Sequence, residues 1–168
     1  MKRLALLLCV AFLAPALVRG QESLSKSFGH GYAFFAPGAA TTFSCRSCTF
    51  GTLHVGGGGE AILYKGLGIG AELGYLVPME EMSQGFGLVS LNGVYVFRRG
   101  GKARVEPFLT GGGTVVISGG AYGGINFGGG VHYWMRKRVG LRIEFRDHVP
   151  TESFNSHLFE GRIGISFR

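Results

Sequence analysis

The chain has 168 residues, enough for one domain, and 31 of them are glycine, far above the usual share of about 7%. Charged residues make up only 16% and hydrophobic residues 46%, which excludes intrinsic disorder, and the glycines lack the period of three of a collagen. So many glycines also argue against a helix bundle, because glycine weakens a helix interior. We therefore expect a small, apolar, all-β domain.

Residues 1–20 have the layout of a secretory signal peptide. Lys2 and Arg3 precede ten apolar residues, and small residues then offer cleavage sites after Ala16 or Gly20. Ten apolar residues are too few for a spanning helix, which needs about 20. We expect residues 21–168 to form the exported domain. Its 14 basic and 10 acidic side chains give a charge of +4, and an exported protein is not expected to bind nucleic acid.

The strongest pattern in the exported part is an alternation of apolar and polar residues with a period of two. In residues 159–168, for example, the odd positions are Phe, Gly or Ile, whereas the even positions include Glu160 and Arg162. Such alternation predicts strands with one apolar and one polar face. The predicted strands are 26–36, 50–63, 65–77, 86–97, 103–114, 122–134, 138–148 and 157–168.

The connections between these segments alternate in length. Those at 64–65, 98–102 and 135–137 are short and basic, whereas those at 37–49, 78–85, 115–121 and 149–156 are longer and polar. An even number of strands, with short turns at one end and longer loops at the other, is typical of outer-membrane barrels. The pattern therefore predicts an all-β fold, an eight-stranded antiparallel up-and-down transmembrane β-barrel.

The polar face of the predicted strands carries charges of both signs. A barrel of eight strands is only wide enough to be filled by side chains, so charges inside it must pair. We expect a polar network in the lumen formed by Glu60, Glu72, Arg104, Glu106, Arg142, Glu144, Arg146, Glu160 and Arg162. The glycines on the same face would make room for the arginine side chains. His54 and His132 would join hydrogen bonds there rather than bind a metal ion.

A soluble barrel of the lipocalin type is the inverse alternative, with the apolar face around a ligand and the charges outside. Alternation alone does not separate the two arrangements. Lipid outside is favoured by aromatic residues near both ends of the apolar face, where they suit the two membrane interfaces. These residues are Tyr95, Phe97, Tyr133 and Phe167 towards one end, and Tyr75, Phe145 and Phe159 towards the other.

The chain resembles the small eight-stranded outer-membrane β-barrel proteins of Gram-negative bacteria, the OmpA-type and OmpX-type barrels. The residues that carry the resemblance are the segments 130–134, 140–147 and 161–167. The resemblance implies location in the cell outer membrane, contact with its lipid, and recognition of the C-terminal strand by the barrel-assembly machinery. Phe167 would be the assembly signal, although Arg168 follows where the family usually ends on the aromatic residue.

Two weaker motifs suggest other chemistry. Cys45 and Cys48 lie in the longest loop, and an exported protein favours a disulfide between them over a zinc site with His30 and His54 or a redox pair. Asp147 and His148 lie near Ser153 and Ser156, as a hydrolase would require. The His-x-Ser motif of lipid A deacylase barrels does not occur in this chain.

The sequence thus favours a non-enzymatic outer-membrane barrel with a structural or interaction role and a lumen plugged by polar side chains. A narrow pore or a carrier of small apolar molecules is the alternative, and a lipid-modifying barrel enzyme is a third. We expect no catalytic residue, no metal site and no cofactor, and a monomeric protein.

Overall fold

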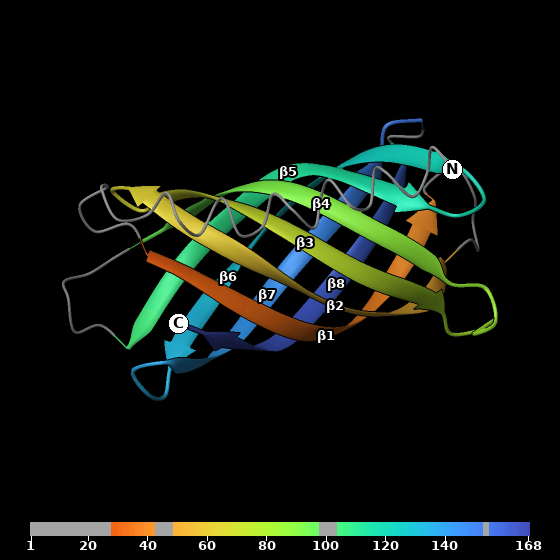
Figure 1. Cartoon of the computed structure of the whole chain (residues 1–168). Helices are drawn as coiled ribbons and strands as arrows, with labels where there is room; N and C mark the ends of the chain where they lie inside the picture. Colours follow the sequence, from red (N-terminus) through yellow and green to blue (C-terminus); the bar gives the residue numbers. More distant parts are fainter. Residues whose placement is uncertain (1–27, 43–48, 98–103, 153–154) are drawn as a thin grey trace, which may run out of the picture.

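The computed structural model describes residues 28–42, 49–97, 104–152 and 155–168. They form the strands β1 (Phe28–Thr42), β2 (Thr49–Tyr64), β3 (Leu67–Pro78), β4 (Phe86–Val96), β5 (Val105–Ile117), β6 (Ala121–Trp134), β7 (Val139–Pro150) and β8 (Ser156–Phe167). Each strand pairs antiparallel with the next, and β8 pairs with β1, so the sheet closes into a barrel of tilted strands (Figure 1). The predicted fold class is confirmed. Among the described residues, no helix is long and apolar enough to cross a membrane.

Several strands are longer than predicted, and β1 differs most. It continues to Thr42, whereas residues 37–49 were expected to be a loop. A loop was expected there because residues 37–49 are rich in Ser, Thr, Gly and Pro. In the structure the β1–β8 ladder is interrupted only at Ala36 and Pro37 and resumes with Gly38 opposite Glu160. Proline lacks the N–H that a ladder needs, so one local gap accommodates it without ending the strand.

The connection between β2 and β3 is a tight turn whose backbone geometry favours glycine. Lys65 and Gly66 form a two-residue turn, and both have positive φ, at 46° and 94°. Positive φ at both central positions is the geometry of a type I′ hairpin turn, which matches the twist of the strands. A side chain at Gly66 would also lie 2.4 Å from the Val96 carbonyl oxygen. The turn is therefore one residue later than the predicted 64–65.

The outer wall of the barrel is apolar. Large hydrophobic side chains remain exposed in the middle of the strands, and Leu91, for example, is 68% exposed. Other exposed hydrophobic residues of the strands include Val55, Ile69, Leu73, Leu109, Ile143 and Ile163. An apolar band around the barrel, combined with closed backbone pairing, is what a hydrocarbon environment requires. The soluble alternative with the apolar face inside is therefore wrong.

The barrel is also tall enough to cross a bilayer. The shortest strand, β4, has 11 residues and the longest, β2, has 16. A transmembrane strand needs about 9–11 residues, so every strand of this barrel can span the hydrocarbon. The aromatic residues predicted at one end, Tyr95, Phe97, Tyr133 and Phe167, are exposed, as are Tyr75 and Phe145 at the other. Phe159 is partly exposed.

The interior is filled by rings and polar side chains. Ile62, Val94, Val96 and Phe108 form an apolar cluster, and Tyr32 and Phe34 point inward from β1. Glycines on the inner face make room for rings as well as for an arginine, since a Cβ at Gly128 would lie 3.3 Å from Cβ of Arg146. A Cβ at Gly58 would lie 2.9 Å from the Tyr32 hydroxyl, and one at Gly74 would lie 2.0 Å from Nε2 of His54.

Candidate functional site

The interior network is built mainly from the residues that alternation assigned to the lumen. The structure places eight of the nine predicted residues in buried positions: Glu60, Glu72, Glu106, Arg142, Glu144, Arg146, Glu160 and Arg162. The expected place of Arg104 in the lumen is wrong, because this residue precedes β5 and its side chain is exposed. The pattern misplaced it because the strand was predicted to start at 103, two residues before its actual start at Val105.

Arg162 connects opposite walls of the barrel. Its Nη1 lies 2.9 Å and 3.0 Å from the two carboxylate oxygens of Glu72 on β3, and its Nε donates to Glu160 at 2.8 Å. The hydroxyl of Tyr32 also donates to Glu72, at 2.8 Å. These bonds join β1, β3 and β8 across the lumen. A guanidinium shared between two carboxylates is an effective way to neutralise buried charge.

Arg142 and Arg146 form a second set of contacts around Glu144. Arg142 donates from Nε to Glu144 at 2.9 Å, and its Nη1 lies 2.8 Å from Oε1 of Glu60 on β2. Arg146 donates to the other oxygen of Glu144 from Nε, at 2.6 Å. Each buried guanidinium therefore has carboxylate partners. This arrangement satisfies charges that would be costly if they were left alone in the interior.

The aromatic rings of the interior pack on the guanidinium groups. The guanidinium carbon of Arg142 lies 4.1 Å from the ring centre of Tyr32 and 4.2 Å from that of Phe108. That of Arg162 lies 4.4 Å from the ring centre of Phe34. Cations over ring faces gain further stabilisation where water is excluded. Alternation did not place Tyr32 or Phe34, because the register of β1 was ambiguous.

Both ends of the lumen carry further hydrogen bonds. Towards the longer loops, Thr114 lies 3.2 Å from Nδ1 of His148 and 2.9 Å from the Ser90 hydroxyl. Towards the short turns, Glu106 accepts from Nε1 of Trp134 at 2.7 Å and from Nη2 of Arg168 at 2.6 Å. Arg168, which follows the predicted assembly signal Phe167, thus takes part in the hydrogen bonds at this end of the lumen.

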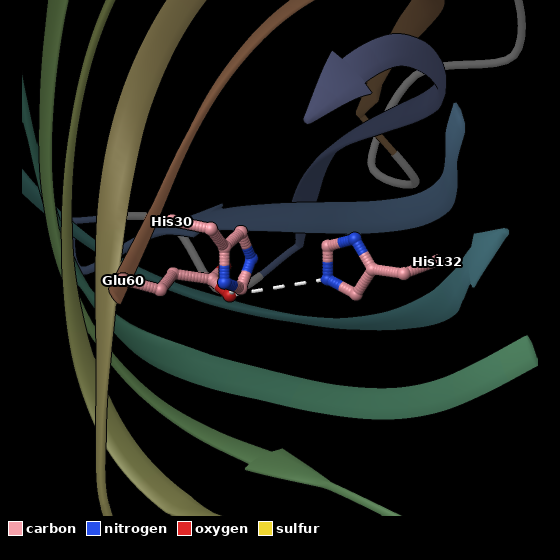
Figure 2. A group of neighbouring side chains, drawn as sticks. All are labelled: His30, Glu60 and His132. Carbon is pink, nitrogen blue, oxygen red and sulfur yellow. Dashed lines mark ion pairs between the residues drawn. The ribbon is translucent and has the colours of Figure 1, made fainter. Parts of the chain in front are cut away.

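Three side chains near the short-turn end converge on one point (Figure 2). They are His30 on β1, Glu60 on β2 and His132 on β6, and all three are buried. Their nearest donor atoms lie within 4.8 Å of one another. The sequence expectation of no metal site did not consider this set. Its members are 30 to 102 positions apart along the chain. His30 and Glu60 are paired in the β1–β2 ladder, and barrel closure brings His132 to them.

The pair Asp147 and His148 does not form a hydrolase site. His148 points into the lumen, where its Nε2 lies 3.1 Å from Nη2 of Arg162. Asp147 points to the outer wall, where its Oδ2 lies 2.8 Å from Nδ1 of His157. Adjacent residues of a strand face opposite sides of the sheet, so these two side chains cannot work together. Ser153, together with residues 1–20, Cys45 and Cys48, lies outside the described residues.

No family model matches the sequence, and no curated protein matches it in sequence. Solved structures do match the barrel. The crystal structure of neisserial surface protein A superposes with a TM-score of 0.64 at 15% identity, covering 85% of this chain and 99% of that one. The chain has the fold of the small eight-stranded outer-membrane β-barrels.

Two more structures show how general this fold is. The N-terminal β-barrel domain of Pseudomonas aeruginosa OprF has a TM-score of 0.61 at 16% identity, with 84% of this chain and 96% of that chain covered. A transmembrane β-barrel designed de novo has a TM-score of 0.53 at 15% identity, with 82% and 93% covered. A fold shared with a designed protein does not define an activity, so function must be argued from the interior and the wall of this barrel.

Proposed function

We propose that this protein is a non-enzymatic resident of the bacterial outer membrane, where its barrel has a structural or interaction role and its lumen is closed. The observation that carries this proposal is the contact between Arg162 and Glu72, which joins opposite walls at 2.9 Å. Side chains bonded across the lumen support an interior that is closed to solutes at that level. The apolar wall described above supports contact with membrane lipid.

The competing function is a narrow pore, and electrical measurement separates the two. The refolded mature chain would be inserted into a planar lipid bilayer beside a porin of known conductance. We expect no steady single-channel current from this protein under conditions in which the porin conducts. A reproducible open current would overturn the plugged lumen. A carrier of small apolar molecules is disfavoured because the buried interior is rich in charged and polar groups.

The proposed location is tested by cell fractionation and electrophoresis with and without boiling. We expect a product lacking residues 1–20 in the outer-membrane fraction, and a change in mobility on heating as the barrel unfolds. A soluble periplasmic product without a heat shift would contradict the proposal.

We also propose that the turns at 65–66 and 135–138 face the periplasm. A cysteine placed at Lys137 should therefore resist an impermeant maleimide on intact cells in a Cys45→Ser, Cys48→Ser background.

Assembly is proposed to depend on the terminal strand. Phe167 pairs with Gly31 and Val139 at the seam of the barrel, and its ring is 49% exposed. We expect Phe167→Ala to lower the amount of heat-modifiable barrel in the outer membrane. Phe97→Ala is the matched control, because Phe97 is 44% exposed and lies at the same end but not on the terminal strand. Equal loss in both variants would contradict a special role for Phe167. We also expect the protein to be a monomer, so chemical cross-linking should give no dimer band.

A lipid-modifying enzyme remains the second candidate because of one observation. Asp147 and His157 form a carboxylate–histidine hydrogen bond on the wall that faces lipid. Such a pair is one component of the machinery that activates a nucleophile. Mass spectrometry of lipid A from cells with the wild-type chain and with His157→Ala tests it. Identical lipid A with and without the protein would exclude this activity.

A further inference from the structure

We propose that His30, Glu60 and His132 form a binding site for a divalent metal ion of the Zn²⁺ class at the short-turn end of the barrel interior. The three residues come from β1, β2 and β6 and face one another (Figure 2). Two imidazoles and one carboxylate are a ligand set that proteins use for zinc, with a fourth position left to water. The proposal concerns binding and goes beyond the structural role of the barrel.

The distances are close to those of a coordination sphere. Nε2 of His30 lies 3.2 Å from Oε2 of Glu60, and Nε2 of His132 lies 4.0 Å from the same oxygen. Two ligands about 2.1 Å from a tetrahedral ion lie about 3.4 Å apart. The His30–Glu60 pair therefore already has the required spacing. Movement of His132 by less than 1 Å towards Glu60 would give that pair the same spacing, and the donor atoms of His30 and His132 lie within 4.8 Å of each other.

Neighbouring groups hold the ligand atoms in the required orientation. Arg142 contacts Oε1 of Glu60 at 2.8 Å, which leaves Oε2 directed at the histidines. The Ser166 hydroxyl lies 3.3 Å from Nδ1 of His132. If Nδ1 carries the proton and donates it to Ser166, the lone pair of Nε2 points towards Glu60. Hydrogen bonds of this kind commonly fix the tautomer and orientation of metal ligands.

Arg142 is also the main obstacle to a cation at this site. Its Nη1 lies 3.3 Å from Nε2 of His132, so the guanidinium competes with an ion for that lone pair. This contact is longer than the bonds of Arg142 to Glu60 and Glu144, at 2.8 Å and 2.9 Å, which do not depend on it. Arg142 can therefore give up the His132 contact and remain paired with both carboxylates.

The charge of the described interior favours a cation. Apart from Glu106 and Arg168, which pair at the barrel end, the buried carboxylates of the lumen are Glu60, Glu72, Glu144 and Glu160. The buried guanidinium groups are Arg142, Arg146 and Arg162. One carboxylate thus exceeds the number of guanidinium groups. A bound cation or a protonated histidine would offset this excess, because uncompensated buried charge is costly.

A second group of two histidines and a glutamate in the same lumen provides an internal comparison. His54 and His148 lie beside Glu160, but Oε1 of Glu160 is bonded to His54 at 2.8 Å and Oε2 to Arg162 at 2.7 Å. His148 is held between Thr114 and Arg162. Nε2 of His148 lies 3.7 Å from Oε2 of Glu160, but Nη2 of Arg162 contacts both atoms, at 3.1 Å and 2.7 Å, so this group should not bind the ion.

The test uses the mature barrel, without a histidine tag, refolded in detergent in a Cys45→Ser, Cys48→Ser background that removes thiolate ligands. Zn²⁺ content is measured after dialysis, Zn²⁺ affinity by calorimetry, and geometry from the visible absorption of Co²⁺. We expect one ion per barrel and the spectrum of a site with nitrogen and oxygen ligands. Affinity should fall about tenfold or more in His30→Gln and His132→Gln and stay unchanged in His54→Gln.

Each outcome decides the proposal. Absence of stoichiometric Zn²⁺ and Co²⁺ binding by the folded parent barrel would overturn it, whatever the variants do. Undiminished binding in both His30→Gln and His132→Gln would also overturn it. Folding of each variant is checked by heat-dependent mobility, and the parent barrel decides alone if a variant does not fold. Because conductance is not measured here, failure of the metal site is distinguishable from failure of the plugged lumen.

Discussion

Asp147 and His157 are joined by a hydrogen bond of 2.8 Å on the side of the barrel wall that carries the apolar residues. Asp147 pairs with Phe127 on β6 and Phe159 on β8, and the His157 ring stacks on Phe159 at 5.4 Å between ring centres. Asp147 is nevertheless only 2% exposed, and its Oδ1 has no hydrogen-bond partner among the described residues. A polar pair at this position is a local departure from the apolar wall.

The energetic role of this pair is tested by a double-mutant cycle. We expect Asp147→Leu and His157→Phe each to lower the free energy of unfolding by about 1–3 kcal/mol, since each leaves one polar partner behind. The double variant should be close to the wild type, because two apolar side chains suit the lipid-facing wall. Urea unfolding in lipid vesicles measures all four proteins. Additive losses in the double variant would show that the two residues do not act as a pair.

Removal of Arg162 should have a much larger effect. Arg162→Leu leaves Glu72 and Glu160 without their main cationic partner inside the barrel. Breaking a buried ion pair in this way costs about 3–5 kcal/mol. The matched control is Arg104→Leu, because Arg104 is exposed before β5. Unfolding monitored by the fluorescence of Trp134 should show a large loss only for the buried residue. Equal stability of the two variants would contradict the bridging role of Arg162.

The space at the inner glycines can be tested with one added methyl group. A Cβ at Gly74 would lie 2.0 Å from Nε2 of His54, which cannot move away easily because Glu160 holds its Nδ1 at 2.8 Å. We expect Gly74→Ala to destabilise the barrel by about 1–3 kcal/mol through overpacking. Gly161→Ala is the control, since a Cβ there meets no atom of the described part of the chain within 4 Å. The heat-shift midpoint measures both, and a neutral Gly74→Ala would show that this interior is loosely packed.

The depth of the barrel in the bilayer is tested by charged substitutions on the outer wall. Leu91 lies in the middle of β4 and is 68% exposed, whereas Ile117 ends β5 and is 51% exposed. We expect Leu91→Arg to cost about 2–4 kcal/mol and Ile117→Arg about 0–1 kcal/mol, because the cost of arginine falls from the bilayer centre to its interface. Unfolding from lipid vesicles gives both values. The reverse order would place the membrane at a different height on the barrel.

The sequence alone predicted the strands and the two faces of the wall. Strand side chains alternate with an exact period of two, so a local pattern is enough to assign Phe145 to the outside and Glu144 to the inside. The same logic placed eight of nine network residues in the interior positions that the structure shows. It failed for Arg104 and for residues 37–42, where the end of a strand depends on whether a neighbouring strand offers partners rather than on local alternation.

Tertiary structure decided which residues touch. Glu72 and Arg162 are 90 positions apart, and the local pattern of either strand contains no information about the other. The meeting of His30, Glu60 and His132 likewise depends on closure of β1 against β8 and on the stagger of the strands around the barrel. Asp147 follows the outward register, but its partner His157 was visible only once β7 and β8 were paired. Alternation assigns a side, whereas register and closure assign the neighbour, because contacts across a lumen join residues that are distant in the chain.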